Sequence, residues 1–265
     1  MGNLLGNKSK IFSAKMGVIL LYLGETKENN KGSLMKIIKI VNSSCIDIEF
    51  QDSHHYVRQT TYNNFKTGGI SNPYFPTVCN IGYHGVGKFA TNNNCVEYVT
   101  WKDMLERCYS EKDKNDHMSY FGISEVCDEW HNFQNFGNWF EENYYEVDER
   151  LHLDKDILYP GNKLYSPYHC LLVPQKINML FMNKPNKRGL PNGIDIAKSG
   201  NFEASYRGKH LGTYSTLEEA YESYSNAKEK RIKEMADEYK NIIPKKVYDA
   251  LYAYKVDIRN DKNYK

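Results

Sequence analysis

The sequence predicts an α+β protein of several small domains, and three patterns along the chain support this. Short segments near the N-terminus alternate apolar and polar residues, as strands do. Aromatic residues recur at helical spacing in the middle, and three short strand-like segments precede a long helical pattern near the C-terminus. The hydrophobic fraction of 40% and the charged fraction of 26% are typical of a folded globular protein, so a wholly disordered chain is excluded.

The length of 265 residues predicts two or three domains. We expect a small β-barrel-like domain over residues 1–91, a helical region with a ββα unit over 92–182, and a three-stranded sheet with helices over 183–265. The net charge of +2 excludes a polycationic tail but allows a local basic face. No run approaches the ~20 apolar residues of a membrane span, so we expect a cytoplasmic protein with no membrane partner.

The expected β-domain rests on one clear hairpin. Residues 34–41 are rich in Ile, Leu and Val, residues 42–44 supply turn chemistry, and residues 45–50 alternate apolar and polar side chains. The apolar run Met16–Leu23 predicts a further strand, because it is too short to span a membrane and lacks a signal-peptide cleavage site. We find no residues in this domain that point to chemistry.

Two helices with aromatic faces are expected in the middle of the chain. The first carries Trp101, Leu105, Cys108 and Tyr109 at helical spacing. The second carries Trp130, Phe133, Phe136, Trp139 and Phe140. All three tryptophans therefore lie in these helices, and we expect the aromatic stripe to form a core rather than a surface on which bases stack.

Residues 151–181 are the best candidate for a functional site. The alternation in residues 151–158 predicts a strand with His152, Asp154 and Asp156 on one face. A turn-rich loop, a second strand and a helix opened by Pro174 follow. Two carboxylates, a histidine and a polar helix residue could hold one divalent cation, which a nuclease uses to stabilise a phosphodiester leaving group. The same pattern is also typical of a solvated hairpin with ordinary surface charges.

Three motifs in this segment resemble those of phage-encoded HNH endonucleases. They are Leu-Asp-Lys-Asp at 153–156, the Gly-Asn to His-Cys stretch at 161–170, and Val-Pro-Gln-Lys-Ile-Asn at 173–178. The segments 101–109 and 126–130 are similar to the leader of the same family, so the likeness extends over residues 80–182. It implies an HNH-type ββα unit and an endonuclease that depends on Mg²⁺ or Mn²⁺, similar to homing or genome-packaging nucleases.

The resemblance implies roles at individual positions. Asp154 matches the carboxylate, and Asn178 the helix residue, that bind the metal ion in this family, and Asp156 is expected to assist them. The position of the family's general-base histidine holds Lys155, and the position of the asparagine that orients this base holds His169. Both catalytic positions outside the metal ligands therefore depart from the family pattern.

These departures leave two alternatives open. A lysine near its ordinary pKa of ~10.4 is protonated at neutral pH and is a poor base. His169 or His152 could then be the base in a rearranged site, since a histidine titrates near pH ~6.5. Otherwise the unit has lost catalysis and kept its affinity for DNA.

The C-terminal region resembles the APETALA2-type DNA-binding domain that accompanies HNH units in homing endonucleases. The matching motifs are Gly193-Ile194, Gly200-Asn201-Phe202-x-Ala204, Leu211-Gly212-Thr213-Tyr214 and Glu218-Glu219-Ala220-Tyr221. In that family a three-stranded sheet reads the major groove. The resemblance implies DNA contacts by Lys198, Arg207, Lys209 and His210. However, Asp195 stands near a base-reading arginine of the plant proteins, and a module for protein contacts is the alternative.

Four further basic residues are candidates for contact with the DNA backbone. Lys163 lies in the loop of the ββα unit, and Lys184, Lys187 and Arg188 lie in the segment that follows it. Such residues are typical of a segment that runs along a phosphate backbone, and equally of a solvated linker.

Three hypotheses for function follow. The first is a phage HNH-type endonuclease that hydrolyses double-stranded DNA with a divalent metal. The second is a catalytically degenerate HNH-like protein that binds DNA or a defence or replication protein of the bacterial host. The third is an adaptor with a Zn²⁺ ion at Cys108, Cys127 and Cys170, although none of the six cysteines forms the CxxC pair typical of such sites.

Overall fold

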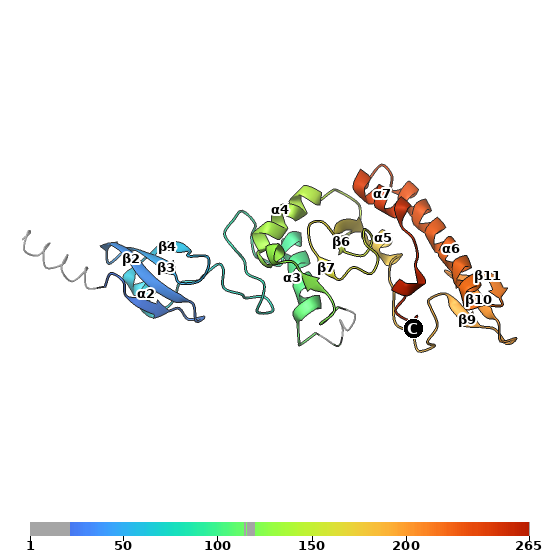
Figure 1. The fold of residues 1–265 in the computed structure, drawn as a ribbon. Coiled ribbons are helices and arrows are strands. Elements are labelled where there is room, and N and C mark those ends of the chain that lie inside the picture. The colour runs from blue at the N-terminus through green and yellow to red at the C-terminus, as the bar shows by residue number, and fades with distance from the viewer. Residues whose placement is uncertain (1–21, 114, 116–119, 265) are drawn as a thin grey trace, which may run out of the picture. The chain divides into compact units, whose positions relative to one another are not determined.

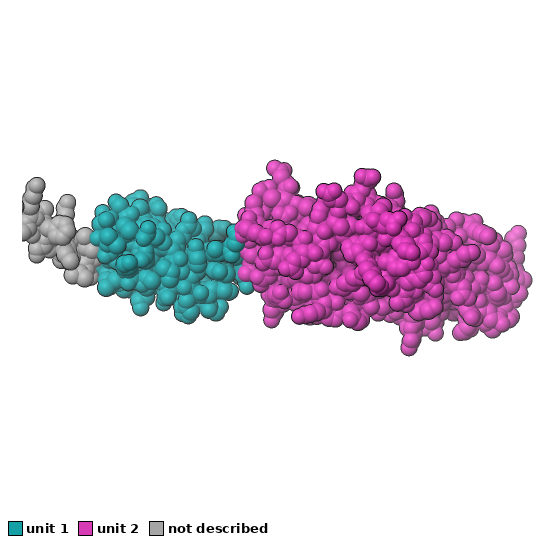
Figure 2. Space-filling model, turned by 90° about the horizontal axis from the view of Figure 1, so that it is seen from above, with its two compact units in different colours: residues 1–87 teal, residues 88–265 magenta. Residues whose placement is uncertain are grey.

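The structure, a computed structural model, describes residues 22–113, 115 and 120–264. Several small sheets and separate helices make up the chain, which confirms the α+β class (Figure 1). Two compact units are present, Met1–Gly87 and Lys88–Lys265 (Figure 2). Their division lies close to the boundary expected after residue 91, and no division falls after residue 182. Most of the strand expected over Met16–Leu23 lies outside the described residues.

The first unit is an antiparallel sheet followed by a short helix. Its elements are β1 (Thr26–Glu28), β2 (Leu34–Asn42), β3 (Cys45–Phe50), β4 (Val57–Thr60) and α2 (Tyr62–Thr67). The predicted hairpin is confirmed, because β2 pairs with β3, and alternate residues of β3 are buried in a core with Phe65. The expected barrel is wrong for the described part of the chain: the sheet is open, since β1 and β4 each have one neighbouring strand.

The second unit begins with the aromatic region. Its first elements are α3 (Val96–Tyr109), β5 (Glu125–Val126), the 3-10 turn η1 (Asp128–His131) and α4 (Phe133–Asn143). The aromatic stripe forms a core, as expected, with Trp101 and Trp130 fully buried. Trp130 lies in η1 rather than in a helix with Trp139, because the side chain of Asn132 caps α4 and starts it at Phe133.

The predicted strand–loop–strand–helix order is confirmed in residues 151–179. Strand β6 (Leu151–Asp154) pairs antiparallel with β8 (Leu171–Pro174), and α5 (Gln175–Met179) follows directly. The short strand β7 (Leu164–Tyr165) belongs to the loop between them and pairs with β5.

The C-terminal region contains the predicted three-stranded sheet. Its elements are β9 (Ile194–Ile196), β10 (Phe202–Tyr206), β11 (Lys209–Tyr214), α6 (Leu217–Glu238), α7 (Lys245–Ala253) and the 3-10 turn η2 (Ile258–Asn260). The strands lie in the order β11-β10-β9, and α6 packs against them (Figure 1). The Thr216 side chain caps the start of α6, since it accepts the backbone N–H of Glu219. No described helix is long and apolar enough to cross a membrane.

One core joins the ββα unit to the C-terminal helices. It contains Ile157, Leu171, Val173, Ile177, Ile232, Met235, Ala236, Ile243, Val247 and Leu251. The first four belong to the ββα unit, and the others belong to α6, α7 and their connection. Residues on both sides of position 182 therefore share buried apolar surface, which stabilises the ββα unit against the two helices.

Candidate functional site

Asp154 ends β6 and turns the chain. Its Oδ1 accepts the backbone N–H groups of Asp156, at 2.8 Å, and Ile157, at 2.7 Å. Burial, and then the neighbouring charge of Asp156, raise the pKa of this carboxyl to about 6. Because the strand ends at Asp154, Asp156 leaves the alternation of the strand. The expected shared face of His152, Asp154 and Asp156 is therefore wrong for Asp156.

Lys155, which follows Asp154 directly, forms an internal ion pair. Its Nζ lies 2.9 Å and 3.0 Å from the two carboxylate oxygens of Asp156 and donates to the carbonyl of Asn162 at 2.5 Å. The same ammonium lies 5.7 Å from the ring centre of Tyr120 and 5.8 Å from that of Tyr165. With a side chain 7% exposed, Lys155 is a buried cation with acceptors and aromatic rings around it.

The Gly-Asn motif shapes the loop that covers this lysine. The Asn162 side chain donates to the carbonyls of Lys155 and Leu164 and accepts the N–H of Leu164. Gly161 adopts a φ of +81°, and a Cβ there would lie 2.6 Å from Oδ1 of Asn260. A larger residue here would strain the backbone and displace the Asn260 side chain.

A second polar pair lies on β6 and α5. Nδ1 of His152 lies 3.1 Å from Nδ2 of Asn178, so the two predicted site residues from the strand and the helix meet. Burial, then the charges of Arg150 and Arg107, lower the pKa of His152. The imidazole is therefore neutral at pH 7, and because Nδ2 of Asn178 donates to Nδ1, Nε2 carries the proton and is the ring nitrogen left for another partner.

Arg107 is a site residue that the sequence did not single out. Its Nε donates to the Asp103 carbonyl at 3.1 Å, and the Asp103 carboxylate lies 3.5 Å from Arg150. Asp103 thus holds two arginines beside the start of β6. The motif around Trp101 contains Arg107, but helical spacing alone does not show that its charge lowers the pKa of His152 on strand β6.

His169 makes its contacts inside its own loop. Its Nδ1 lies 2.6 Å from Oγ of the buried Ser166, and its ring centre lies 5.1 Å from that of Tyr159. These contacts fix the tight turn before β8. The structure thus places the two candidate bases, His152 and His169, in different hydrogen-bonded pairs.

The two carboxylates implied as ligands of a divalent metal already have partners within this chain. Within the described ranges, no three His, Cys, Asp or Glu side chains form a group that could hold a metal ion. Oδ1 of Asp154 accepts two backbone N–H groups, and both oxygens of Asp156 face the Lys155 ammonium. Lys155 thus neutralises one of the carboxylates that the resemblance implies for Mg²⁺ or Mn²⁺. Cys108, Cys127 and Cys170 do not form a zinc-binding group either.

Most of the basic residues expected to contact DNA are available for it. Lys163, Lys184, Lys187, Lys198, Arg207 and Lys209 are exposed. None of these six forms an ion pair with a described residue, whereas Arg188 pairs with Asp195. An exposed cation without a carboxylate partner is available to a phosphate.

The outward face of the three-stranded sheet carries carboxylates. Asp195 of β9 and Glu203 of β10 are directly paired in the sheet register, so their side chains lie on the same face. Their neighbours Ile194 and Ala204 are buried against α6 on the other face. Lys198, Arg207 and Lys209 lie in or beside the turns at the strand ends.

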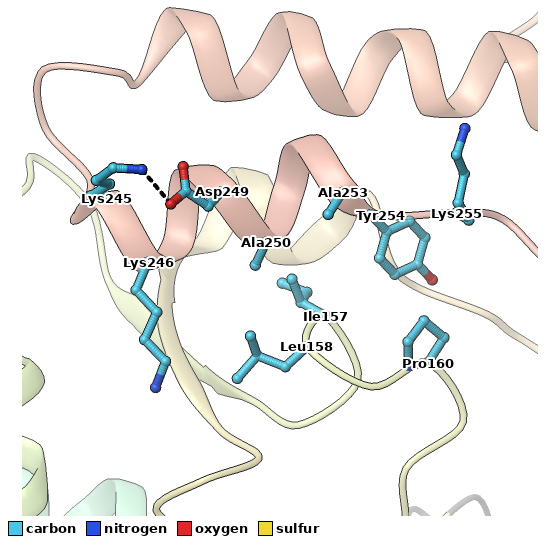
Figure 3. A pocket seen from close by; sticks show the side chains of 10 residues that line it. All are labelled: Ile157, Leu158, Pro160, Lys245, Lys246, Asp249, Ala250, Ala253, Tyr254 and Lys255. Carbon is cyan, nitrogen blue, oxygen red and sulfur yellow. Dashed lines mark hydrogen bonds and ion pairs between the residues drawn. The ribbon is translucent and has the colours of Figure 1, made fainter.

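A pocket of about 720 Å³ lies between α7 and the loop after β6 (Figure 3). Apolar side chains such as Leu158, Pro160 and Ala250 form its centre, and lysines lie at its rim. The one carboxylate in its lining, Asp249, pairs with Lys245 at 2.5 Å. The pocket therefore contains no acid–base pair, and the His152–Asn178 pair is the better candidate for chemistry.

Comparison with family models, with curated proteins and with solved structures finds no match for this chain. The likeness to HNH endonucleases and to APETALA2-type domains therefore stays a prediction from sequence motifs.

Proposed function

We propose that this chain is a non-catalytic DNA-binding protein built on an HNH-like ββα unit and an APETALA2-like module. The observation that carries this proposal is the buried contact of the Lys155 ammonium with Asp156 and the Asn162 carbonyl. In HNH nucleases this position supplies the general base, beside a divalent ion. Here a lysine both replaces the base and neutralises a carboxylate expected to bind the ion, so binding without cleavage is the function that this geometry favours.

The distribution of basic residues supports contact with the DNA backbone. The unpaired cations lie in the ββα loop, in the following linker and at the ends of the sheet strands, where they can approach phosphates. Backbone contacts carry little sequence information and weaken steeply with salt. The protein should therefore bind duplex DNA with a strong salt dependence and little sequence preference.

Two assays on the same protein test the proposal. Fluorescence anisotropy with a labelled duplex, between 50 and 200 mM KCl, measures affinity and its salt slope on a scale where several phosphate contacts change binding by orders of magnitude. Incubation of supercoiled plasmid with EDTA, Mg²⁺ or Mn²⁺ measures nicking. We expect salt-dependent binding that is the same in EDTA and in metal, and no nicking. Nicking that needs metal, or an absence of binding at low salt, would contradict the proposal.

A nuclease is the second candidate, and the His152–Asn178 pair favours it. His152 is a general base at Nε2 when the Asn178 amide is turned so that its oxygen accepts from Nδ1–H, because Nε2 is then unprotonated and can take a proton from water. If the chain cleaves DNA, His152→Gln should abolish nicking, whereas His169→Gln should leave it nearly unchanged, because His169 contacts its own loop. The opposite result would assign the base to His169.

A further inference from the structure

We propose that the C-terminal strap, residues 254–264, is a latch that fixes the linker 183–192 in one conformation for contact with the DNA backbone. This inference rests on the proposed DNA binding and adds positioning residues to it. The linker contains Lys184 and Lys187, two of the unpaired basic residues.

Hydrogen bonds join the linker to the strap at several points. Asn183 donates to the Asn260 carbonyl at 2.8 Å, and the Lys184 carbonyl accepts from the Asn263 side chain at 3.1 Å. The N–H of Asn186 donates to Oδ1 of Asn263 at 2.6 Å. Two of these bonds involve the backbone of Lys184 and of Asn186, which precedes Lys187, so they restrain the path of the linker itself.

Asp261 is the centre of the network. Its Oδ2 accepts both the N–H and the side-chain amide of Asn192, each at 3.0 Å. Its Oδ1 accepts the N–H of Asn263 at 2.9 Å and the Asn263 amide at 3.0 Å. Asp261 is 7% exposed and Asn263 is 5% exposed. A buried polar network in which each member has partners specifies one arrangement, because any other leaves polar groups unpaired.

The strap is itself held at other points of the same compact unit. The N–H of Val256 donates to Glu229 of α6 at 3.0 Å. Lys262 lies 5.8 Å from the ring centre of Tyr120, the ring that Lys155 also approaches. Asn260 lies against Gly161 of the ββα loop. The linker is therefore tied to the ββα loop and to α6 through the strap.

An ordered linker has already lost the conformational freedom that a flexible one would lose on binding. A positioning role makes a different prediction from a contact role. Loss of the latch should weaken DNA binding on the order of tenfold at fixed salt and leave the salt slope nearly unchanged, because the lysines remain. Loss of a lysine should lower the slope by ~0.9 for each phosphate contact.

The test uses the full chain with Asn263→Ala and Asn192→Ala, and with Asn241→Ala as a matched control. Asn241 is exposed and lies in the connection between α6 and α7. Hydrogen exchange of residues 183–192 reports the latch, anisotropy at several salt concentrations reports DNA binding, and tryptophan fluorescence confirms that each variant is folded. Lys187→Met provides the contact-role reference.

The expected result is faster exchange in the linker and weaker binding with the original slope for both latch variants, and no change for Asn241→Ala. Faster exchange with wild-type affinity would overturn the positioning role. Unchanged exchange in both variants would overturn the latch. If the wild-type chain binds no DNA, the proposed function fails and this role fails with it, while the exchange data still report whether the strap orders the linker.

Discussion

Two lysines of the same loop should respond in opposite ways to the same substitution. Lys155 is buried in an ion pair, whereas Lys163 is exposed and has no ion-pair partner among the described residues. We expect Lys155→Met to destabilise the second unit and leave the salt slope of DNA binding unchanged. We expect Lys163→Met to leave stability unchanged and lower the salt slope by ~0.9.

The size of the Lys155 effect follows from its contacts. Methionine keeps the apolar stem but removes the donors to Asp156 and to the Asn162 carbonyl. A hydrogen bond to a charged group contributes about 1.5–3 kcal/mol, and a cation near an aromatic ring contributes ~0.5–1 kcal/mol at exposed sites and more when desolvated. The Asp156 side chain is 38% exposed, so water can solvate it after the loss. We therefore expect a decrease of about 2–4 kcal/mol in the free energy of unfolding.

Urea denaturation followed by tryptophan fluorescence measures this change in the second compact unit, which contains Lys155. The three tryptophans, at positions 101, 130 and 139, all lie in the unit Lys88–Lys265, so their signal does not report the first unit. The free energy comes from linear extrapolation with a common slope. Anisotropy on the same samples gives the salt slope.

Equal stability of Lys155→Met and Lys163→Met would refute the reasoning, because it would mean that the buried ion pair contributes nothing. A lower salt slope for Lys155→Met, with stability unchanged, would place this lysine on DNA. Either result would contradict the buried ion pair of Lys155 with Asp156, on which the non-catalytic proposal rests.

Two further substitutions test the second unit, each by urea denaturation. Gly193→Ala should lower the free energy of unfolding by about 2–4 kcal/mol, because φ is +80° and a Cβ would lie 2.2 Å from the Tyr224 ring. Gly200→Ala, at φ +87° in open space, should lower it only by the ~1–2 kcal/mol that the left-handed backbone costs. Equal losses for the two variants would contradict the predicted clash. The folded-state pKa of Asp154, at about 6, lies above its unfolded value of ~3.9, so its stabilising contribution is complete below pH ~4 and is lost as the pH rises to about 6. Asp154→Asn should therefore gain about 3 kcal/mol in the free energy of unfolding relative to wild type across this window, and a constant difference from pH 4 to 8 would contradict the raised pKa.

Much of the fold could be predicted from local signals. The β2–β3 hairpin followed from alternation and turn residues, and the three-stranded sheet before α6 followed from three short strand-like segments. The ββα order was also predicted from pattern and motif. These features depend on residues close together in the chain, which is why the sequence indicates them.

The missed features depend on contacts between distant segments. The strap after α7 has no periodic pattern. Its asparagines bind the linker, which lies 77 positions earlier in the chain, and the sequence does not show this contact. The prediction that Asp156 shares a strand face with His152 and Asp154 was wrong, because the Asp154 side chain accepts the N–H of Asp156 and ends the strand in a turn. Side-chain hydrogen bonds to the backbone compete with strand continuation, and periodicity alone does not show this.

The charge pattern of the sheet module limits how it could approach DNA. Asp195 and Glu203 lie side by side on the outward face, and Arg188 neutralises only the first. If this carboxylate pair entered the major groove, the phosphates on both sides would repel it. No basic residue at the centre of the face offsets this repulsion. The turns at the strand ends, with Lys198 at one and Arg207 and Lys209 at the other, carry no such cost. We therefore expect Glu203→Gln to strengthen duplex binding if the sheet face meets DNA and to leave affinity unchanged if the turns do, and the proposed backbone contact requires the second result.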